Sequence, residues 1–147
     1  LIMGLIKDNS YTHICTATGT ATTLAGILMA AKPEQIVINF PVLKGITDTK
    51  IRIAQLTGNE SEFKNLVTVN NYHFGGYAKK SDLLIQFMNQ CWRQHRLPLD
   101  FVYTAKMFFG ITDCIKNDSF VKGSKILCLH TGGLQGNKSL PLNTLLF

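Results

Sequence analysis

Short apolar runs rich in β-branched residues alternate with longer segments of helical periodicity, and this alternation constrains the fold more than any other feature of the chain. We expect strands at 11–16, 35–40, 66–69 and 125–129. We expect helices at 1–8, 23–31, 47–57, from a cap at Ser81 to just before Pro98, and at 103–116, followed by an irregular tail over 134–147. Such alternation is typical of proteins with a mostly parallel, buried sheet. The predicted fold class is α/β, a three-layer arrangement with a mostly parallel twisted sheet flanked by helices.

The amount and distribution of charge argue against a nucleic-acid-binding protein. The 147 residues fit one domain and carry a net charge of +6, with 16% charged residues in total. The basic residues stand singly or in pairs such as Lys79-Lys80, without the stripe of Lys and Arg interleaved with aromatics that marks nucleic-acid surfaces. An anionic cofactor and small anionic substrates account for the same positive charge.

The cysteines and the apolar runs indicate a cytoplasmic protein. Cys15, Cys91, Cys114 and Cys128 lie in apolar stretches and form no Cys-x-x-Cys pair, so we expect buried free thiols and no metal site. Free thiols suit a reducing compartment. The longest apolar runs are shorter than the ~20 residues of a membrane span, and the stretch Leu1-Ile2-Met3-Gly4 has no preceding basic region of a signal peptide.

The segment Thr16-Ala17-Thr18-Gly19-Thr20-Ala21-Thr22-Thr23 joins a predicted strand to a predicted helix. Small residues let the backbone approach an anion, and the free N–H groups of a helix start favour a phosphate. The segment is neither a Walker loop nor a Gly-x-Gly-x-x-Gly motif. A tight strand-to-helix turn with threonine caps is the structural alternative.

Three further motifs could carry chemistry. His130-Thr131-Gly132-Gly133 follows a predicted strand, where ligands bind in open α/β sheets, and its glycines would admit a flat ligand. Tyr103-Thr104-Ala105-Lys106 begins a predicted helix, and Gly75-Gly76-Tyr77 lies in a loop. The structural alternatives are a turn for the first, a helix cap with half-buried packing for the second, and a surface turn for the third.

The stretches CTATGTATTLAG, HFGGYAK, LDFVYTAKMFFGI and HTGGLQGN run through nearly the whole chain. Their order resembles that of the D-cysteine desulfhydrase / 1-aminocyclopropane-1-carboxylate deaminase family. The resemblance implies a tryptophan-synthase-β-like fold, which is fold type II of the pyridoxal-phosphate enzymes, and it implies pyridoxal 5′-phosphate as the cofactor. Residues 1–147 would form the C-terminal part of the large, cofactor-binding domain.

The same resemblance implies roles for individual residues. The loop that holds the cofactor phosphate is matched by Thr20, Ala21, Thr22 and Thr23. The residue that meets the pyridine nitrogen is matched by Thr131, with Gly132 beside it at the cofactor. Two catalytic tyrosines near the substrate are matched by Tyr103 and Tyr77, and Thr104 would line the substrate pocket. A threonine hydroxyl at the pyridine nitrogen makes only a neutral hydrogen bond, so the ring would be a weaker electron sink than one paired with a carboxylate.

Two positions separate the activities within the family. Deaminase members resemble Tyr-Glu where this chain has Tyr103-Thr104, and they carry Leu at the position of Thr131. Both positions favour β-elimination from D-cysteine to pyruvate, sulfide and ammonia, with 1-aminocyclopropane-1-carboxylate deamination as the alternative. The resemblance also implies a small amino-acid substrate and a homodimer for the intact enzyme.

The family's cofactor-linking lysine lies in an early Gly-Asn-Lys segment that has no counterpart here. Lys106 stands in a different motif and is not a replacement. We therefore expect an incomplete piece of the enzyme, catalytically inactive on its own because β-elimination needs a base and a covalent link to the cofactor. A non-catalytic phosphate-binding module and a purely structural remnant remain as alternatives of a different class.

Overall fold

The computed structural model describes residue 6 and residues 10–59 and 63–147. Its elements in chain order are β1 (His13–Thr18), α2 (Thr22–Ala30), β2 (Ile36–Pro41), α3 (Thr49–Thr57), β3 (Leu66–Thr68), α4 (Asp82–His95), α5 (Thr104–Lys116), β4 (Ile126–Cys128) and the 3₁₀ helix η1 (Leu134–Ser139). All eight strands and helices predicted between residues 11 and 129 are confirmed, with ends that differ by up to two residues. The helix predicted for 1–8 lies, apart from Ile6, outside the described residues.

The tail differs from its prediction in one respect. Residues 134–139 form η1 rather than irregular chain. Gly133 precedes this helix with φ 95°, a backbone conformation that glycine adopts without steric cost, so the chain can turn there directly into the helix. Six residues are too few for a recognisable apolar period.

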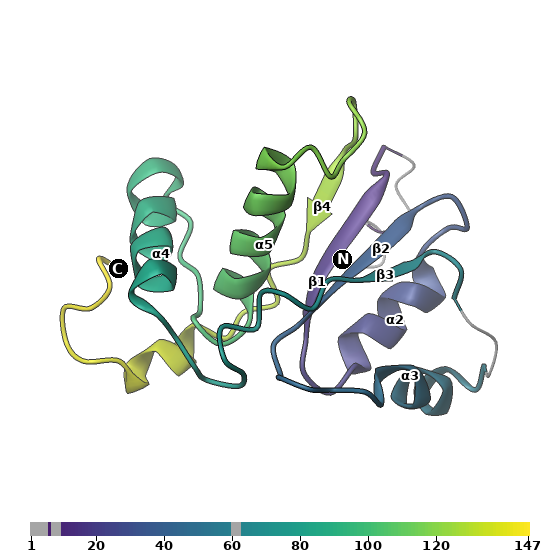
Figure 1. The fold of residues 1–147 in the computed structure, drawn as a ribbon, viewed down its shortest axis with the longest axis horizontal. Helices are drawn as coiled ribbons and strands as arrows, with labels where there is room; N and C mark the ends of the chain where they lie inside the picture. Colours follow the sequence, from purple (N-terminus) through teal and green to yellow (C-terminus); the bar gives the residue numbers. More distant parts are fainter. Residues whose placement is uncertain (1–5, 7–9, 60–62) are drawn as a thin grey trace.

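The four strands form one sheet in the order β3-β2-β1-β4, and every neighbouring pair is parallel. Ile14 and Val37 face one way and pack with α2 and α3, whereas Cys15 and Ile38 face the other way and pack with α5. This division follows from the alternation of side chains along a strand. The predicted three-layer α/β architecture is confirmed, with α2 and α3 on one face and α5 on the other (Figure 1).

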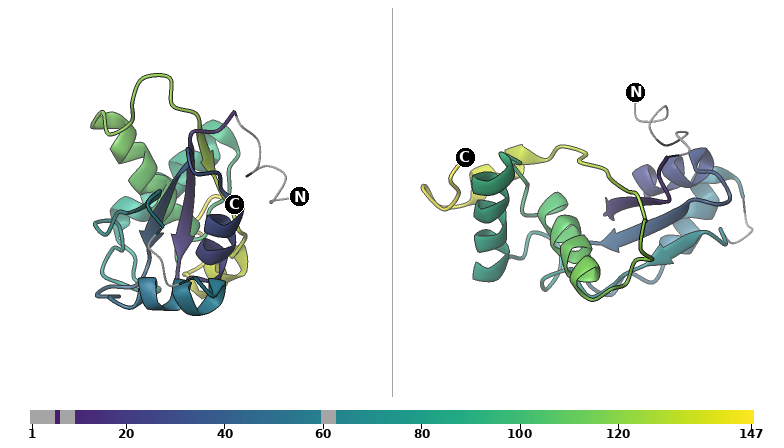
Figure 2. Two further views of the ribbon diagram at one scale, coloured as in Figure 1. Left: turned by 90° about the vertical axis from the view of Figure 1, so that its right-hand side faces the viewer. Right: turned by 90° about the horizontal axis from the view of Figure 1, so that it is seen from above.

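Helix α4 lies beyond α5, away from the sheet, as Figure 1 and the right-hand view of Figure 2 show. Its apolar stripe, Leu84, Met88 and Cys91, packs with Ala105 of α5 in a second core. Ser81 caps α4 by accepting a hydrogen bond from the N–H of Leu84, as its position in the sequence predicted. None of the described helices has the length and hydropathy that a membrane span requires.

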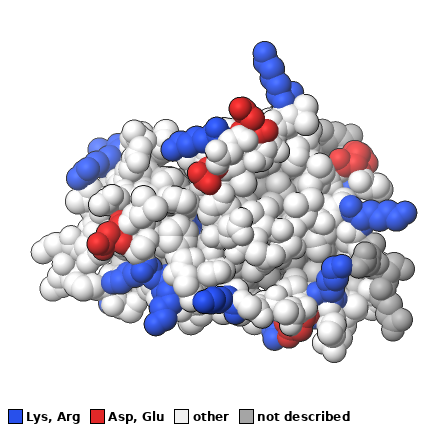
Figure 3. All heavy atoms as spheres, in the orientation of Figure 1, with Lys and Arg blue, Asp and Glu red and all other residues white. Residues whose placement is uncertain are grey.

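The strand order brings the carboxyl ends of β1 and β4 together. The chain leaves β1 for α2 on one face of the sheet, and it reaches β4 from α5 on the other face. A reversal of this kind leaves a crevice at the carboxyl ends of the two strands, which is where open α/β sheets bind ligands. Lys and Arg side chains are spread singly over the face seen in Figure 3 rather than gathered into a stripe.

Candidate functional site

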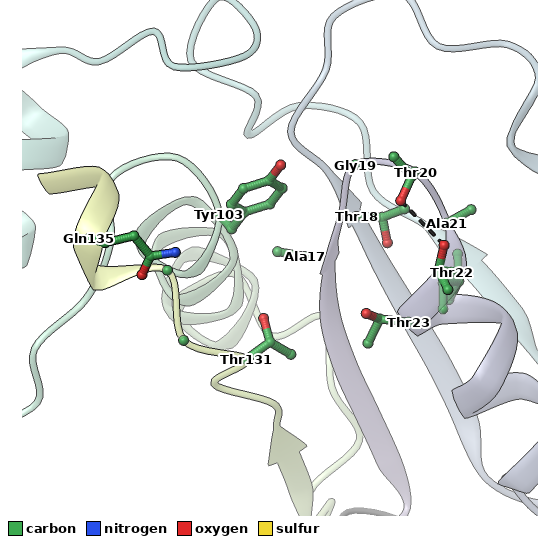
Figure 4. Close-up of a pocket in the computed structure, with 13 residues that line it drawn as sticks. Ala17, Thr18, Gly19, Thr20, Ala21, Thr22, Thr23, Tyr103, Thr131 and Gln135 are labelled. Carbon is green, nitrogen blue, oxygen red and sulfur yellow. Dashed lines mark hydrogen bonds between the residues drawn. The ribbon is translucent and has the colours of Figure 1, made fainter. Parts of the chain in front are cut away.

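A cleft of about 320 Å³ lies at the carboxyl ends of β1 and β4. The loop after β1, the start of α5 and the loop after β4 form its walls (Figure 4). The lining residues are Ala17, Thr18, Gly19, Thr20, Ala21, Thr22, Thr23, Leu24, Tyr103, Thr131, Gly132, Gly133 and Gln135. Three of the four motifs singled out in the sequence therefore meet in one place.

The first turn of α2 opens onto this cleft without a capping side chain. Ala21 is the N-cap residue, in the left-handed conformation with φ 69°, and no side chain of the described part caps the helix. The first helical hydrogen bond runs from the N–H of Ala25 to the carbonyl of Ala21, so the N–H groups of residues 22–24 have no partner within the helix. Threonine capping is thus not what this loop does. Exposed N–H groups together with the helix dipole make a position that favours an anion.

Thr18 is a site residue that sequence reasoning missed. Its side chain is only 4% exposed, yet its hydroxyl oxygen has no hydrogen-bond partner among the described residues. Figure 4 shows this hydroxyl directed towards Thr23 at the start of α2. A buried hydroxyl without a partner costs free energy, so an unpaired one at a cleft indicates room for a polar ligand. The predicted strand ended at residue 16; in the structure β1 continues to Thr18, and this is why its orientation could not be foreseen.

Three threonines of the loop are exposed, whereas Thr18 is buried. Thr20, Thr22 and Thr23 are all exposed, and the hydroxyls of Thr20 and Thr22 lie 3.4 Å apart. Figure 4 shows the loop on one side of the cleft, with Tyr103, Thr131 and Gln135 opposite. The residues predicted to hold a cofactor are therefore brought together from two strands that lie more than 100 positions apart in the sequence.

Tyr103 is held at the cleft from several directions. Its backbone N–H donates to the buried carboxylate of Asp100 over 2.8 Å, and a methyl group added at Gly19 would lie 3.1 Å from its ring. Its ring meets that of Tyr77 edge to face, with 6.2 Å between centroids. Burial, followed by the neighbouring Tyr77, raises the pKa of Tyr103, so its phenol keeps its proton at neutral pH.

The turn after β4 is fixed by His130. The N–H of Gly132 donates to Nδ1 of His130 over 3.2 Å, so Nε2 carries the proton and donates to the carbonyl of Pro98 over 2.8 Å. Gly132 and Gly133 both have positive φ, and a side chain at Gly133 would come within 3.0 Å of Asp100. Thr131 lines the cleft, with Gly132 in the wall beside it.

Two predicted site residues lie elsewhere. Thr104 is fully buried, and its hydroxyl donates to Asp100 over 2.6 Å, so it supports the start of α5 and is not among the cleft-lining residues. The prediction that it lines a substrate pocket is corrected on this point. Tyr77 is 57% exposed and touches Tyr103 without lining the cleft.

The structure also adds Gln135, which lines the cleft from η1. No sequence signal could have identified it, because η1 itself was not predicted. Among the described residues no group of three or more His, Cys, Asp or Glu side chains is arranged to hold a metal ion.

The chain is similar to known proteins in sequence and in fold. No protein-family model matches the chain. It is 32% identical over 137 residues to a Pyrococcus furiosus protein named "Putative 1-aminocyclopropane-1-carboxylate deaminase", covering 86% of this chain and 41% of that protein. It is 30% identical over 118 residues to a 1-aminocyclopropane-1-carboxylate deaminase of Pseudomonas syringae pv. syringae, covering 80% of this chain and 34% of that protein.

A solved structure described as an ACC deaminase homologue shares the fold. It aligns with a TM-score of 0.74 over 92% of this chain and 44% of that chain, at 24% sequence identity. The chain spans about two fifths or less of the length of these two curated relatives. Both of them carry the deaminase name.

Proposed function

Because the chain is homologous to the 1-aminocyclopropane-1-carboxylate deaminases over the part of them that it spans, we propose that it forms the phosphate-binding side of a pyridoxal 5′-phosphate site in a deaminase of this kind. The observation that carries the proposal is the uncapped start of α2, which opens onto the cleft next to the unpaired hydroxyl of Thr18. The relatives named above are enzymes by name, and the cofactor is the one that the family resemblance implies.

The residues present fit the phosphate of such a cofactor. The N–H groups at residues 22–24 supply donors along the helix dipole, and the hydroxyls of Thr20, Thr22 and Thr23 lie around them. Thr18 would gain the partner that it lacks. When bound, the cofactor would supply a pyridine ring that withdraws electrons from the α-carbon of a substrate linked to it through the amino nitrogen.

The residues opposite the loop after β1 would orient the pyridine ring of the cofactor, and one of them would transfer a proton. Thr131 lines the cleft and would hydrogen-bond the ring nitrogen without charging it, and Gly132 would leave room for the flat ring. The phenol of Tyr103 is protonated at neutral pH, as an ordinary tyrosine is, and its raised pKa holds the proton more firmly, so it would donate a proton before it accepts one. Tyr77 would act through Tyr103, because it touches that ring and lies outside the cleft lining.

The names of the relatives make 1-aminocyclopropane-1-carboxylate the first substrate to test. D-cysteine is the second candidate, because the hydroxyl of Thr131 stands in the cleft where the family's deaminase members carry Leu. Thr104 gives less support to D-cysteine than Thr131 does, because its side chain is buried against Asp100. Activity on either substrate would be a property of the complete enzyme.

Binding can be tested on this chain without turnover. Pyridoxine 5′-phosphate carries the phosphate and the ring but no aldehyde, so it cannot react with surface lysines. We expect it to shift the backbone amide resonances of residues 18–24 and 131–135 in ¹⁵N NMR spectra, and we expect inorganic phosphate to compete. Pyridoxine, which lacks the phosphate, should leave residues 18–24 unmoved at the same concentration.

The outcomes separate the three classes of function. Shifts at both segments support the cofactor site, whereas shifts at residues 18–24 that inorganic phosphate alone reproduces indicate a phosphate-binding module. A dispersed spectrum with no shift in either segment would refute both, and a collapsed spectrum would indicate a structural remnant.

The substitution Thr23→Ala tests the contribution of one loop hydroxyl to the binding of pyridoxine 5′-phosphate. We expect it to weaken pyridoxine 5′-phosphate binding by about 5-fold to 150-fold, corresponding to loss of a charge-assisted hydrogen bond of about 1–3 kcal/mol. Thr112→Ala is the matched control, because the hydroxyl of Thr112 donates to the carbonyl of Phe108 within α5, away from the cleft. Equal dissociation constants for the two variants would count against the phosphate-binding assignment.

A further inference from the structure

The loop that carries Tyr77 has an unusual backbone. Between residues 74 and 78, four residues have positive φ: Phe74 at 52°, Gly75 at 93°, Gly76 at 122° and Ala78 at 51°. Positive φ is unfavourable for residues other than glycine, so the surrounding structure must hold this loop in its shape. The position of Tyr77 therefore depends on whatever ties the loop to the rest of the protein.

Lys106 ties the loop to α5. Its side chain is only 1% exposed, and its ammonium donates to the carbonyl of His73 over 2.9 Å and to that of Gly76 over 2.6 Å. These two carbonyls flank the turn that precedes Tyr77. A buried ammonium is costly, and burial lowers the pKa of Lys106 to about 8 while Asp100 acts in the opposite direction. Lys106 does not line the cleft. Because its burial costs free energy, this lysine has a role other than keeping the protein in solution.

Asp100 fixes the other tyrosine in a corresponding way. Its buried carboxylate accepts the N–H groups of Val102, Tyr103 and Thr104 and the hydroxyl of Thr104. This cap sets where α5 begins and therefore where the ring of Tyr103 stands. Asp100 thus holds Tyr103 through the backbone at the start of α5. Lys106 holds the loop that carries Tyr77.

We propose that Lys106 is a positioning residue, which holds the loop at residues 73–76 so that the phenol of Tyr77 meets Tyr103 at the edge of the cleft. Tyr77 is 57% exposed, and its ring contact is the one with Tyr103. Without the bonds from Lys106, the strained loop relaxes and Tyr77 moves into solvent. Tyr103 then loses the neighbour that helps to keep its proton in place. The consequence for turnover rests on the proposed function, but the consequence for Tyr103 does not.

The test uses the whole chain and the ionisation of Tyr103. Lys106→Met keeps the length of the side chain and removes both hydrogen bonds, and Lys79→Met removes an exposed lysine from the same region as a control. Tyrosine ionisation is followed by NMR of ¹³Cζ-labelled tyrosine, with the resonance of Tyr103 assigned from Tyr103→Phe. We expect loss of the cross-relaxation between the two rings in Lys106→Met, together with a lower pKa of Tyr103, because the contribution of Tyr77 to its raised pKa is lost. In Lys79→Met both should stay as in the wild type.

A second variant guards against a failure to fold. Gly76→Ala places a side chain on a backbone at φ 122° and loosens the loop while it leaves the buried lysine in α5 unchanged. The same fall in the pKa of Tyr103 is expected. A folded Lys106→Met or Gly76→Ala protein in which Tyr103 titrates as in the wild type overturns the proposal.

Binding of pyridoxine 5′-phosphate serves as the independent readout. The dissociation constant should change by less than about twofold in Lys106→Met, because the loop at residues 18–24 is untouched by the substitution. A large loss of binding would mean that Lys106 supports the whole core, which also contradicts a positioning role. If wild-type protein fails to bind the compound, the proposed function fails while the Tyr103 titration still decides this inference.

Discussion

Gly110 lies where α5 packs tightly against Phe40 of the sheet, and replacing it with alanine should destabilise the protein. A Cβ there would lie 2.6 Å from Cε1 of Phe40 and 2.8 Å from Cδ2 of Tyr72. To restore even a tight contact of 3.4 Å, the ring of Phe40 or the helix must retreat by about 0.8 Å. The substitution Gly110→Ala therefore tests whether α5 packs on the sheet as described.

Neither ring can move freely. Phe40 is 1% exposed within the core between the sheet and α5, and the hydroxyl of Tyr72 donates to Asp113 over 2.7 Å. Overpacking of this kind costs about 1–3 kcal/mol, and the rigid neighbours place this site in the upper part of the range. Alanine regains about 0.5–1 kcal/mol over glycine inside a helix, so the net loss should be about 2 kcal/mol.

Urea denaturation followed by far-ultraviolet circular dichroism measures this loss. With a slope of about 1–3 kcal/mol per molar urea, the midpoint should fall by roughly 1 M. Gly26→Ala is the matched control: it lies inside α2, and its added methyl group meets no described atom within 4 Å. It should therefore stabilise the chain by about 0.5–1 kcal/mol. If both variants shift the midpoint upwards by similar amounts, the packing of α5 against Phe40 is not as described.

The remaining predictions concern the cleft and its surroundings. Gly19→Ala should displace the ring of Tyr103 by a few tenths of an ångström, seen as changed ring resonances with less than about 1 kcal/mol lost in urea denaturation, since the added methyl group would lie 3.1 Å from that ring. The pKa of Lys106 is lowered to about 8 in the folded chain, so the unfolded chain binds more protons above that pH and folding gains stability as the pH rises. The free energy of unfolding of the wild type minus that of Lys106→Met should thus increase by about 2 kcal/mol between pH 7 and pH 9.5, and a flat difference would contradict the lowered pKa. In the complete enzyme, Thr131→Leu should lower turnover of D-cysteine more than turnover of 1-aminocyclopropane-1-carboxylate, and unchanged D-cysteine kinetics would remove Thr131 from the site.

Much of the fold could be predicted because it depends on short-range patterns. Pro33 and Pro41 follow apolar runs that they end, and Ser81 stands one residue before a helix whose apolar residues recur with helical spacing. These signals act within a few residues, so a single sequence suffices to read them. The limits of β1 were less certain, because residues 16–18 alternate strand-forming threonine with alanine and lead into Gly19, and only pairing with β2 extends the strand to Thr18.

The candidate site, like the fold, could be predicted from the sequence only in part. The loop at residues 16–23 and the turn at residues 130–133 could be identified from their small residues and glycines, which permit close approach of a ligand. For Tyr103-Thr104 the structural alternative, a helix cap beside half-buried packing, agrees with the structure. The partner of Thr104 could not be foreseen, because the burial of the Asp100 carboxylate depends on the tertiary structure.

By itself, the sequence determined the alternation of strands and helices, the parallel sheet and the composition of the loops that line the cleft, because these depend on residue type and local spacing. Only the tertiary structure decided that β4 pairs with β1, and this pairing places Thr131 opposite the loop at residues 18–24. It also decided which buried polar groups have hydrogen-bond partners. The hydroxyl of Thr104 has one in Asp100, whereas the hydroxyl of Thr18 has none among the described residues. Strand pairing and hydrogen-bond satisfaction join residues far apart in the chain, and no local pattern of residues specifies them.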